Sequence, residues 1–412
     1  MTAIHADIDR WLDARDAESV TFLAQLVKVP SDTPPGDNAP HAERAAALLA
    51  AMQFDVERHA VPAATVHDAG LRSITNLVVR HRFGAGPTVA LNAHGDVVPP
   101  GGGWTREPYG AQIQDGRMYG RGVAVSKSDF ATYAFALAAL RAAHAQGHSL
   151  RGCVELHFTY DEEMGGELGP ARLLATGVTQ PDFAICAGFS YGIVTAHNGC
   201  LQLEADVRGR SAHAAIPQSG IDALEASVAL LSDLYASREA LTRIRSQVPG
   251  ITHPTLNIGR IEGGVHTNVV PDQVMFRVDR RIVPEEDPAQ VEDALRQLLE
   301  ASAIRHHGIE LRLRRLLLAD PLRPVPGQQR LVEALARHAT RLYGEPITAI
   351  GVPLYTDARH YARAGVPAVL YGAGPRSIEA SNAKRADENL VLEDLRKATR
   401  VVACAVADLL SG

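Results

Sequence analysis

The sequence predicts an α/β protein with a smaller α+β domain inserted into it. Strand-like and helical stretches alternate over residues 1–199 and again over 319–412, as in α/β domains. Residues 200–318 between them follow the order βαββαβ of a ferredoxin-like unit. A chain of 412 residues also exceeds the length at which one hydrophobic core usually keeps growing. We therefore expect two domains, with linkers near residues 200 and 318.

Hydrophobic periodicity predicts the individual elements. The first segment contains helices at 4–28, broken near 16–19, at 42–52 and at the alanine-rich stretch 130–145, and strands at 56–61, 74–80, 89–91, 153–160 and 183–186. The inserted domain contains strands at 201–207, 255–261, 273–282 and 309–316 and helices at 221–235 and 288–303. The last segment contains a helix at 331–342, a strand at 367–371 and a closing helix at 392–410.

Composition argues against several classes of protein. The net charge is −6 with both signs interspersed, so we expect no binding to nucleic acid or to an anionic membrane surface. The four cysteines are scattered without C-x-x-C spacing, which argues against a disulfide framework and against a zinc ribbon. The N-terminus has no apolar signal segment, and no window approaches the roughly 18 apolar residues of a membrane span. These features predict a soluble, cytoplasmic protein.

Two polar stretches stand at the predicted carboxyl ends of strands, where open α/β sheets bind ligands. In His94-Gly95-Asp96 the first and third side chains share one side of the strand, which suits a metal-ligating histidine beside a carboxylate. In Asp161-Glu162-Glu163, desolvation and mutual repulsion can raise one pKa toward that of a general base. The alternatives are a polar loop for the first stretch and an acidic helix N-terminus for the second.

Several motifs follow one another in order along nearly the whole chain. They are His94–Pro100, Trp104–Gly110, Asp115–Gly122, Asp161–Glu163, Gly209–His213, Asn268–Pro271 and Thr356–Arg359. Together they resemble the family of succinyl-diaminopimelate desuccinylase, acetylornithine deacetylase, aminoacylase and glutamate carboxypeptidase, co-catalytic zinc hydrolases of amide bonds. The resemblance implies a zinc-peptidase-like α/β catalytic domain with an inserted ferredoxin-like lid that usually dimerises.

The resemblance also implies roles for residues in the catalytic domain. His94 becomes a metal ligand and Asp96 its orienting carboxylate. Glu162 becomes the general base for the attacking water, and Glu163 a ligand of the second metal ion.

In the lid, the resemblance makes His213 and Asn268 donors to the developing oxyanion, and His213 often reaches across a dimer. Arg281 occupies the position that grips a substrate carboxylate, as a bidentate guanidinium can. The alternative for His213 and Arg281 is a solvated lid surface. The implied partners are a small-molecule substrate and a second copy of the chain.

Three expected metal ligands are replaced, which makes the chain a divergent member. Val125 stands where the family has the aspartate that bridges both ions, and Gly188 where a first-metal carboxylate follows the next strand. Lys384 stands four residues before Glu388, at the place of a histidine. Two neighbouring divalent ions need an anionic bridge, which a valine cannot supply.

We hypothesise that the two-metal centre is absent, with Lys384 as its partial electrostatic substitute. At most one divalent ion, Zn or Mn, could remain on His94 and Glu163 with a recruited third ligand. The alternative for Asp129 is the N-cap of a helix. The alternative for His157 and His197 is a packed or hydrogen-bonded histidine. The candidates by chain proximity are Asp129, His157, His197, Ser126 and Ser128.

The function that follows is hydrolysis of an amide or related C–N bond in a small carboxylate-bearing substrate, of the deacylase, amidohydrolase or dipeptidase type. Water is activated by Glu162, and Lys384 polarises the electrophile if no metal ion does. The alternative is a non-catalytic relative that binds a small molecule or serves as a dimeric scaffold. A third interpretation makes Lys384 a Schiff-base nucleophile.

Overall fold

The computed structural model describes residues 2–411, which form two compact units. The larger unit comprises the chain up to Thr195, Pro324–Ile350 and the chain from Thr356 onward. The smaller unit comprises Ala196–Arg323 and Gly351–Tyr355. The predicted insertion at 200–318 lies within the smaller unit, but the five-residue return segment has no counterpart in the prediction. Backbone hydrogen bonds hold this segment, because Gly351 N donates to Pro249 O and Asn198 N to Val352 O.

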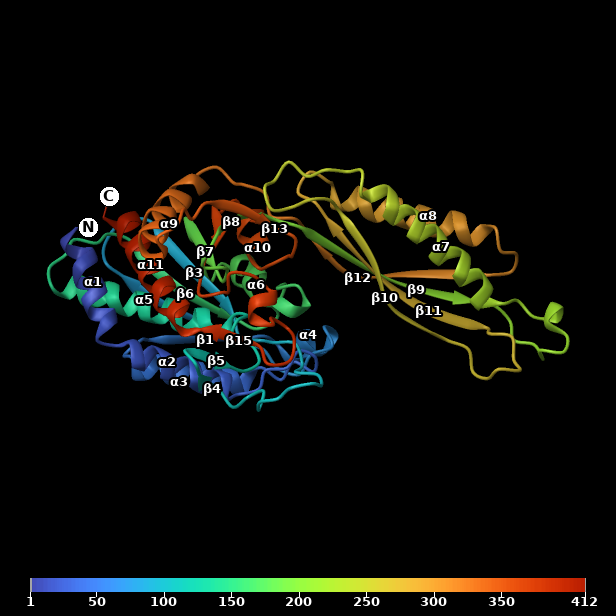
Figure 1. Ribbon diagram of the computed structural model, residues 1–412, viewed down its shortest axis with the longest axis horizontal. Helices are drawn as coiled ribbons and strands as arrows, with labels where there is room; N and C mark the ends of the chain where they lie inside the picture. The colour runs from blue at the N-terminus through green and yellow to red at the C-terminus, as the bar shows by residue number, and fades with distance from the viewer. Residues whose placement is uncertain (1, 412) are drawn as a thin grey trace. The chain divides into compact units, whose positions relative to one another are not determined.

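An eight-stranded mixed sheet runs through the larger unit (Figure 1). The four strands β6, β3, β7 and β14 at its centre are parallel, whereas β2 pairs antiparallel to β1 and to β6. The parallel strands therefore end at one common edge. In sheet order the strands are β1 (Val56–Ala60), β2 (Thr75–Arg82), β6 (Cys153–Thr159), β3 (Thr88–His94), β7 (Phe183–Cys186), β14 (Ala368–Leu370), β8 (Ile193–His197) and β13 (Ala349–Val352).

Helices pack against both faces of this sheet. One group packs around α5 (Lys127–Ala145) and its neighbours. Its other members are α1 (Ala3–Asp13), α2 (Asp16–Val27), α3 (Ala39–Ala51), α9 (Gln328–Tyr343) and α11 (Leu392–Leu410). A second, smaller group consists of α6 (Pro170–Ala175) and α10 (Ala358–Arg363). Outside both groups lie α4 (Ala63–Asp68) and a three-stranded sheet of β4 (Gln112–Gln114), β5 (Arg117–Tyr119) and β15 (Asn389–Val391).

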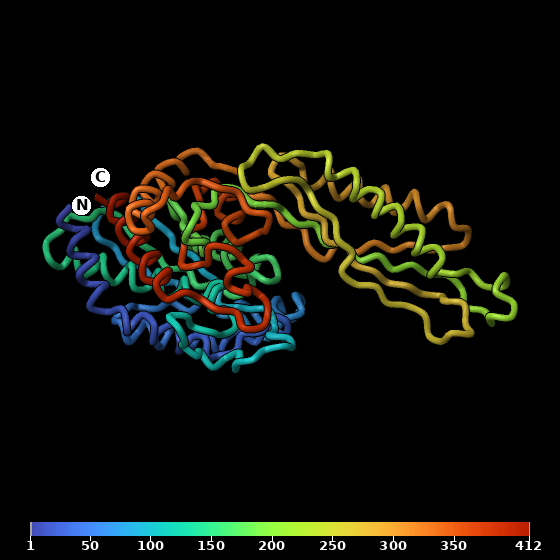
Figure 2. The backbone as a smooth tube through the Cα atoms, viewed as in Figure 1, coloured from blue at the N-terminus to red at the C-terminus, as the bar shows by residue number. Residues whose placement is uncertain are grey.

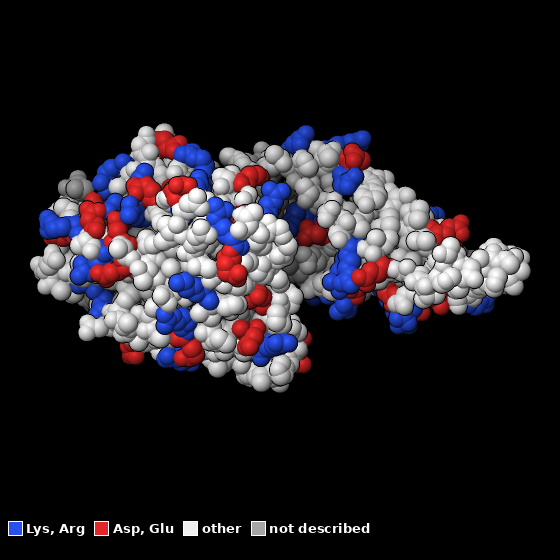
Figure 3. Space-filling model, turned by 60° about the horizontal axis from the view of Figure 1, so that its bottom comes forward, with Lys and Arg blue, Asp and Glu red and all other residues white. Residues whose placement is uncertain are grey.

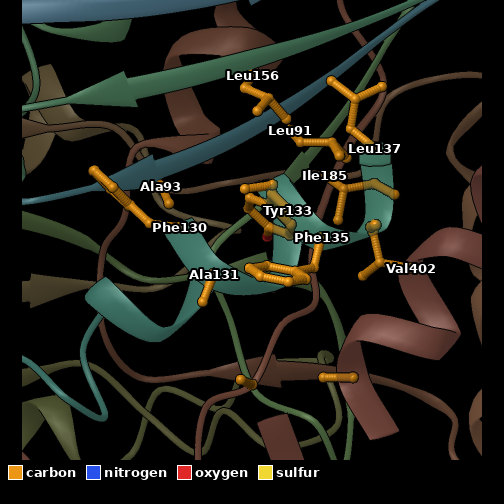
Figure 4. Close-up of a cluster of buried hydrophobic side chains, with 14 of the residues drawn as sticks. Leu91, Ala93, Phe130, Ala131, Tyr133, Phe135, Leu137, Leu156, Ile185 and Val402 are labelled. Atoms are coloured by element: carbon orange, nitrogen blue, oxygen red, sulfur yellow. The ribbon is translucent and has the colours of Figure 1, made fainter. Parts of the chain in front are cut away.

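The main core lies between the sheet and α5. Alternate residues of the strands, such as Leu91 and Leu156, face Tyr133 of α5, and Val402 of α11 closes the cluster (Figure 4). Helix α5 is buried on nearly all sides, which explains its alanine-rich composition, because small side chains let neighbouring helices approach. The prediction of a helix over 130–145 is thus confirmed, with an earlier start at Lys127.

The smaller unit is a four-stranded antiparallel sheet with two helices. Its chain order is β9 (Gly199–Arg208), α7 (Ala223–Leu241), β10 (Thr255–Gly263), β11 (Gln273–Ile282), α8 (Pro288–Ile304) and β12 (Glu310–Ala319), and its sheet order is β10-β11-β9-β12. It has a core of its own, which includes Leu203, Leu230, Phe276 and Leu299. The predicted βαββαβ order and the α/β plus α+β fold class are confirmed.

No helix among residues 2–411 is long and apolar enough to cross a membrane. Basic and acidic side chains alternate over the face of the larger unit drawn in Figure 3, without a broad patch of one sign. All four cysteines are buried, and none of them forms a disulfide bond within residues 2–411. The structure thus has no disulfide framework among the residues it describes.

Candidate active site

The candidate site lies at the carboxyl edge of the parallel strands. His94 is the last residue of β3, Asp161 follows β6 closely, and Gly188 follows β7. The parallel pairing of β3 with β6 and with β7 places the ends of all three strands side by side. Polar residues separated by more than sixty positions in the sequence meet here for this reason.

Asp96 organises the first part of the site. Its side chain is fully buried and accepts hydrogen bonds from the backbone N–H groups of Glu162 (3.3 Å) and Glu163 (3.0 Å). His94 Nδ1 lies 3.0 Å from the Asp96 carbonyl and 3.4 Å from its Oδ1. Gly95 between them packs on Tyr160, because a Cβ at residue 95 would lie 2.3 Å from the ring. The structure therefore brings His94, Asp96 and the acidic stretch together.

Glu162 and Glu163 form a single 3-10 turn, Glu162–Met164, that ends at Gly165 with φ of 109°. Glu162 is buried, and its Oε2 lies 3.7 Å from His94 Nε2. Burial raises the pKa of Glu162, as do the neighbouring carboxylates, although His94 and Lys384 oppose this shift. A raised pKa is what a general base needs at neutral pH.

His94 carries a positive charge in this environment. Burial favours the neutral ring, but Glu162, Asp96 and Glu163 outweigh burial and raise the pKa of His94 to about 10. The imidazolium thus balances part of the negative charge of the site.

Lys384 reaches the site from the loop before β15. Its Nζ lies 2.7 Å from Glu163 Oε2, and its side chain is 49% exposed, whereas that of Glu163 is buried. Desolvation alone would lower the pKa of Lys384, but Glu163 and Glu162 outweigh it and raise the pKa. The amine is therefore held charged, which argues against the Schiff-base interpretation, since that nucleophile must be neutral.

The positions of the other two replaced ligands supply no donor side chain. Val125 lies directly before Ser126, whose Oγ accepts a hydrogen bond from His94 N at 3.1 Å. A Cβ at Gly188 would lie 2.7 Å from Leu370 Cβ and 2.8 Å from the backbone of Tyr371. The space for a carboxylate at residue 188 is thus closed by the loop after β14.

Asp129 does not cap its helix, so that interpretation is wrong. The N-cap of α5 is Ser126, and the Asp129 carboxylate instead accepts hydrogen bonds from the backbone N–H groups of Ala373 (2.7 Å) and Gly188. These two backbone groups lie on the loops that follow β14 and β7. Burial raises the pKa of Asp129 to about 7, against the effect of His94.

His157 and His197 have structural partners. His157 contacts Tyr361 Oη at 2.8 Å and Glu155 Oε2 at 2.9 Å, within a buried polar network. His197 Nδ1 lies 2.9 Å from Asn198 O and 3.3 Å from Leu322 N. These contacts agree with the packed and hydrogen-bonded interpretation of both rings.

Two further buried carboxyl groups, whose roles the sequence did not suggest, belong to this edge of the sheet. Burial and the nearby Asp96 raise the pKa of Asp161 to about 8. Burial, Glu162 and Asp161 raise the pKa of Asp357 well above its ordinary value. Their positions in the acidic stretch and in the Thr356–Arg359 motif were visible, but burial of the carboxyl groups was not. The raised pKa values favour the neutral forms of both carboxyl groups, which limits the negative charge around Glu162.

The remaining predicted site residues lie in the smaller unit. His213 and Asn268 stand on neighbouring segments, with Ala214 N donating to Asn268 O at 2.9 Å, and both are exposed. Arg281 Nε donates to Asp279 Oδ1 at 2.8 Å, and its guanidinium lies 5.6 Å from the centre of the Tyr355 ring. The smaller unit thus presents two neighbouring polar side chains and one oriented guanidinium.

Comparisons with known proteins agree with this architecture. The chain matches the model of peptidase family M20/M25/M40 over residues 90–408. It is 29% identical to an acetylornithine deacetylase of Myxococcus xanthus over 380 residues, which are 91% of this chain and 93% of the relative. An acetylornithine deacetylase of Edwardsiella ictaluri is 30% identical over 82% of this chain and 84% of its own length.

Solved structures share the fold over nearly the full length. A di-peptidase of Saccharomyces cerevisiae superimposes with a TM-score of 0.80 at 14% identity, covering 100% of both chains. An M20 family metallo-carboxypeptidase of Sulfolobus solfataricus gives 0.76 at 20% identity, covering 96% of this chain and 99% of its own. The family match over most of the chain, together with acidic and basic side chains gathered at one edge of an α/β sheet, leads to one conclusion. The chain belongs to peptidase family M20/M25/M40 and is a hydrolase of the amidohydrolase type.

Proposed function

We propose that the chain cleaves an amide or related C–N bond in a small carboxylate-bearing substrate without the two-metal centre of its family. One observation carries this proposal. Two cationic side chains face two carboxylates, with Lys384 Nζ 2.7 Å from Glu163 Oε2 and His94 Nε2 3.7 Å from Glu162 Oε2. These four side chains occupy the region where the resemblance implies metal ions.

The residues present do not fit a pair of divalent ions. Val125 cannot bridge two ions, and the closed space at Gly188 excludes a side chain there. The Lys384 ammonium repels a cation next to Glu163. We propose that the site holds at most one divalent ion and that the reaction does not depend on it.

The proposed chemistry uses side chains alone. Glu162, whose pKa is raised by burial, takes a proton from the attacking water and returns it to the leaving nitrogen when the C–N bond breaks. The charge of Lys384 stabilises the negative oxygen that develops on the attacked carbonyl, as an oxyanion hole does. Glu163 holds the Lys384 amine in place, and Asp96 fixes the turn that carries both glutamates. His94 keeps the site from accumulating negative charge, because it lies against Glu162 as an imidazolium.

The substrate class rests on the relatives and on one lid residue. Relatives include acetylornithine deacetylases and a human carnosine dipeptidase, so N-acyl amino acids and dipeptides are the first compounds to test. Arg281 is proposed to bind the substrate carboxylate, and His213 and Asn268 to donate to the oxyanion. These three assignments remain predictions from the family resemblance.

The proposed dimer contact lies on the smaller unit. Strand β10 is at the edge of its sheet, so its outer backbone groups can pair with a second copy. Helix α7 carries three large apolar side chains on one face that are largely exposed: Leu224 (44%), Val228 (55%) and Tyr235 (42%). We call these residues the α7 stripe. An exposed apolar stripe beside an open sheet edge supports a homodimer through the lid.

The test is turnover by purified protein over a panel of N-acyl amino acids and dipeptides, with and without a chelator. Glu162→Gln should abolish turnover while substrate binding, measured by calorimetry, stays close to wild type. Glu167→Gln is the matched control, because Glu167 follows on the same loop but its side chain is 55% exposed. Unchanged turnover in Glu162→Gln would reject Glu162 as the base. Binding by the wild type without turnover of any compound would favour the non-catalytic alternative.

A further inference from the structure

A second cluster of potential ligands joins the two ends of the described chain. His5 lies on α1, His338 on α9 and Asp408 on α11, and the first and last helices run side by side in the larger unit (Figure 2). His5 Nε2 lies 2.9 Å from Asp408 Oδ1, and His338 Nε2 lies 2.8 Å from Asp408 Oδ2. Three helices thus send one donor atom each to a common point.

The geometry of this cluster suits a metal ion. All three donor atoms lie within 4.8 Å of one another, and no other group of three or more His, Cys, Asp or Glu side chains among residues 2–411 meets that condition. The two rings stand nearly perpendicular, with an interplanar angle of 74° and centroids 4.7 Å apart. Two imidazole nitrogens and one carboxylate oxygen are a donor set that zinc takes in proteins, with water as the fourth ligand.

The two histidines of this cluster are buried, whereas its aspartate is partly exposed to solvent. His5 and His338 are only 6% and 4% exposed, so their rings are fixed by packing. The Asp408 side chain is 22% exposed, which leaves one side open to solvent and to an entering ion.

The hydrogen-bond partners of His5 and His338 permit a metal ion to replace the proton on Nε2. Without an ion, each Nε2–H donates to Asp408. When Nε2 binds an ion, the proton moves to Nδ1 and the ring remains neutral. His5 Nδ1 then has a partner in place, because Thr2 Oγ1 lies 3.0 Å away, and such an oxygen orients metal-bound histidines. Arg337 Nη1 also lies 2.9 Å from Asp408 Oδ2, but its side chain is 65% exposed and can turn into solvent.

We propose that His5, His338 and Asp408 form a zinc site that clamps α1 to α9 and α11. The site is separate from the candidate active site, since none of its residues belongs to the strand ends that carry His94 and Glu162. Its role is structural, because its three ligands come from three helices that a bound ion would hold together. It ties the first helix of the chain to the last.

The experiment is a zinc titration of the full chain after chelator treatment and dialysis. Calorimetry measures affinity and stoichiometry, and circular dichroism measures the thermal midpoint with and without zinc. His338→Gln is the test variant, because an amide can keep a hydrogen bond to Asp408 and preserve the fold. His59→Ala is the matched control, since His59 also contacts a carboxylate, Glu57, but its side chain is 30% exposed. His94→Ala removes the histidine of the candidate active site that the resemblance makes a metal ligand.

We expect one zinc ion to bind per wild-type chain and to raise the thermal midpoint. We expect the same in His59→Ala and His94→Ala. His338→Gln should weaken zinc binding by more than about tenfold and abolish the thermal shift. Equal zinc affinity in His338→Gln and wild type would overturn the proposal. Loss of binding in His94→Ala with retention in His338→Gln would do the same and would place the ion in the active site instead.

Discussion

Replacing Lys384 by methionine separates its proposed catalytic role from any role in stability. The side chain is 49% exposed, and exposed ion pairs contribute about 0–1 kcal/mol to folding, so the free energy of unfolding should fall by no more than about 1 kcal/mol. Loss of one group that stabilises a developing oxyanion costs about 3–4 kcal/mol of transition-state stabilisation. We therefore expect kcat/KM to fall by roughly 10²–10³ while the protein stays folded.

The assay is steady-state turnover of the best compound in the panel, with urea denaturation of the same samples. Lys397→Met is the matched control, because Lys397 also pairs with a glutamate, Glu393, at 3.9 Å, on the surface of α11. Its activity should equal that of wild type. Wild-type kcat/KM in Lys384→Met would refute the role given to this amine. A loss of activity that parallels a loss of folded protein would refute it too.

Three further predictions concern stability, metal binding and assembly. The folded chain holds a proton on Asp129 up to about pH 7, whereas the unfolded chain loses it near 3.8, so stability falls as pH rises between these values. Asp129→Asn should remove this loss, so its effect on the free energy of unfolding, measured by urea denaturation, should be more favourable by about 2–4 kcal/mol at pH 8 than at pH 4.5. An equal effect at both pH values would contradict this prediction. Gly188→Asp should lower stability by about 1–3 kcal/mol because of its contact with Leu370, without gain of bound metal by mass spectrometry. Two ions per chain in that variant would show that the site can be rebuilt. Val228→Asp in the α7 stripe should convert a dimer into a monomer by light scattering, and an unchanged mass would rule out this contact.

Much of the fold follows from local patterns. Alternation in 153–159 and the long alanine-rich run predicted β6 and α5, since both depend on periodicity within one segment. The return segment Gly351–Tyr355 was not predictable, because hydrogen bonds to distant residues decide which unit it joins. Strands β8 and β13 were missed for a similar reason, since they are short and depend on pairing.

The candidate site could be predicted where the family resemblance assigns a position to a residue. The resemblance implies a metal ligand four residues before Glu388, where Lys384 stands, and Lys384 Nζ lies 2.7 Å from Glu163 Oε2. The prediction that Asp129 is a helix N-cap was wrong. Its position in the first turn of α5 suggests a hydrogen bond within that turn, but its hydrogen-bond partners lie on other loops. The raised pKa of Asp357 depends on burial among carboxyl groups, which no local pattern reports.

The most direct test of the central claim is turnover by metal-free protein. The measurement uses the His338→Gln variant, in which the proposed zinc site of His5, His338 and Asp408 should no longer bind zinc. It combines kcat/KM after chelation with metal content by mass spectrometry. If the reaction uses Glu162 and Lys384 without metal ions, kcat/KM will be the same before and after chelation. Loss of activity on chelation, restored by two equivalents of zinc or manganese, would contradict the account.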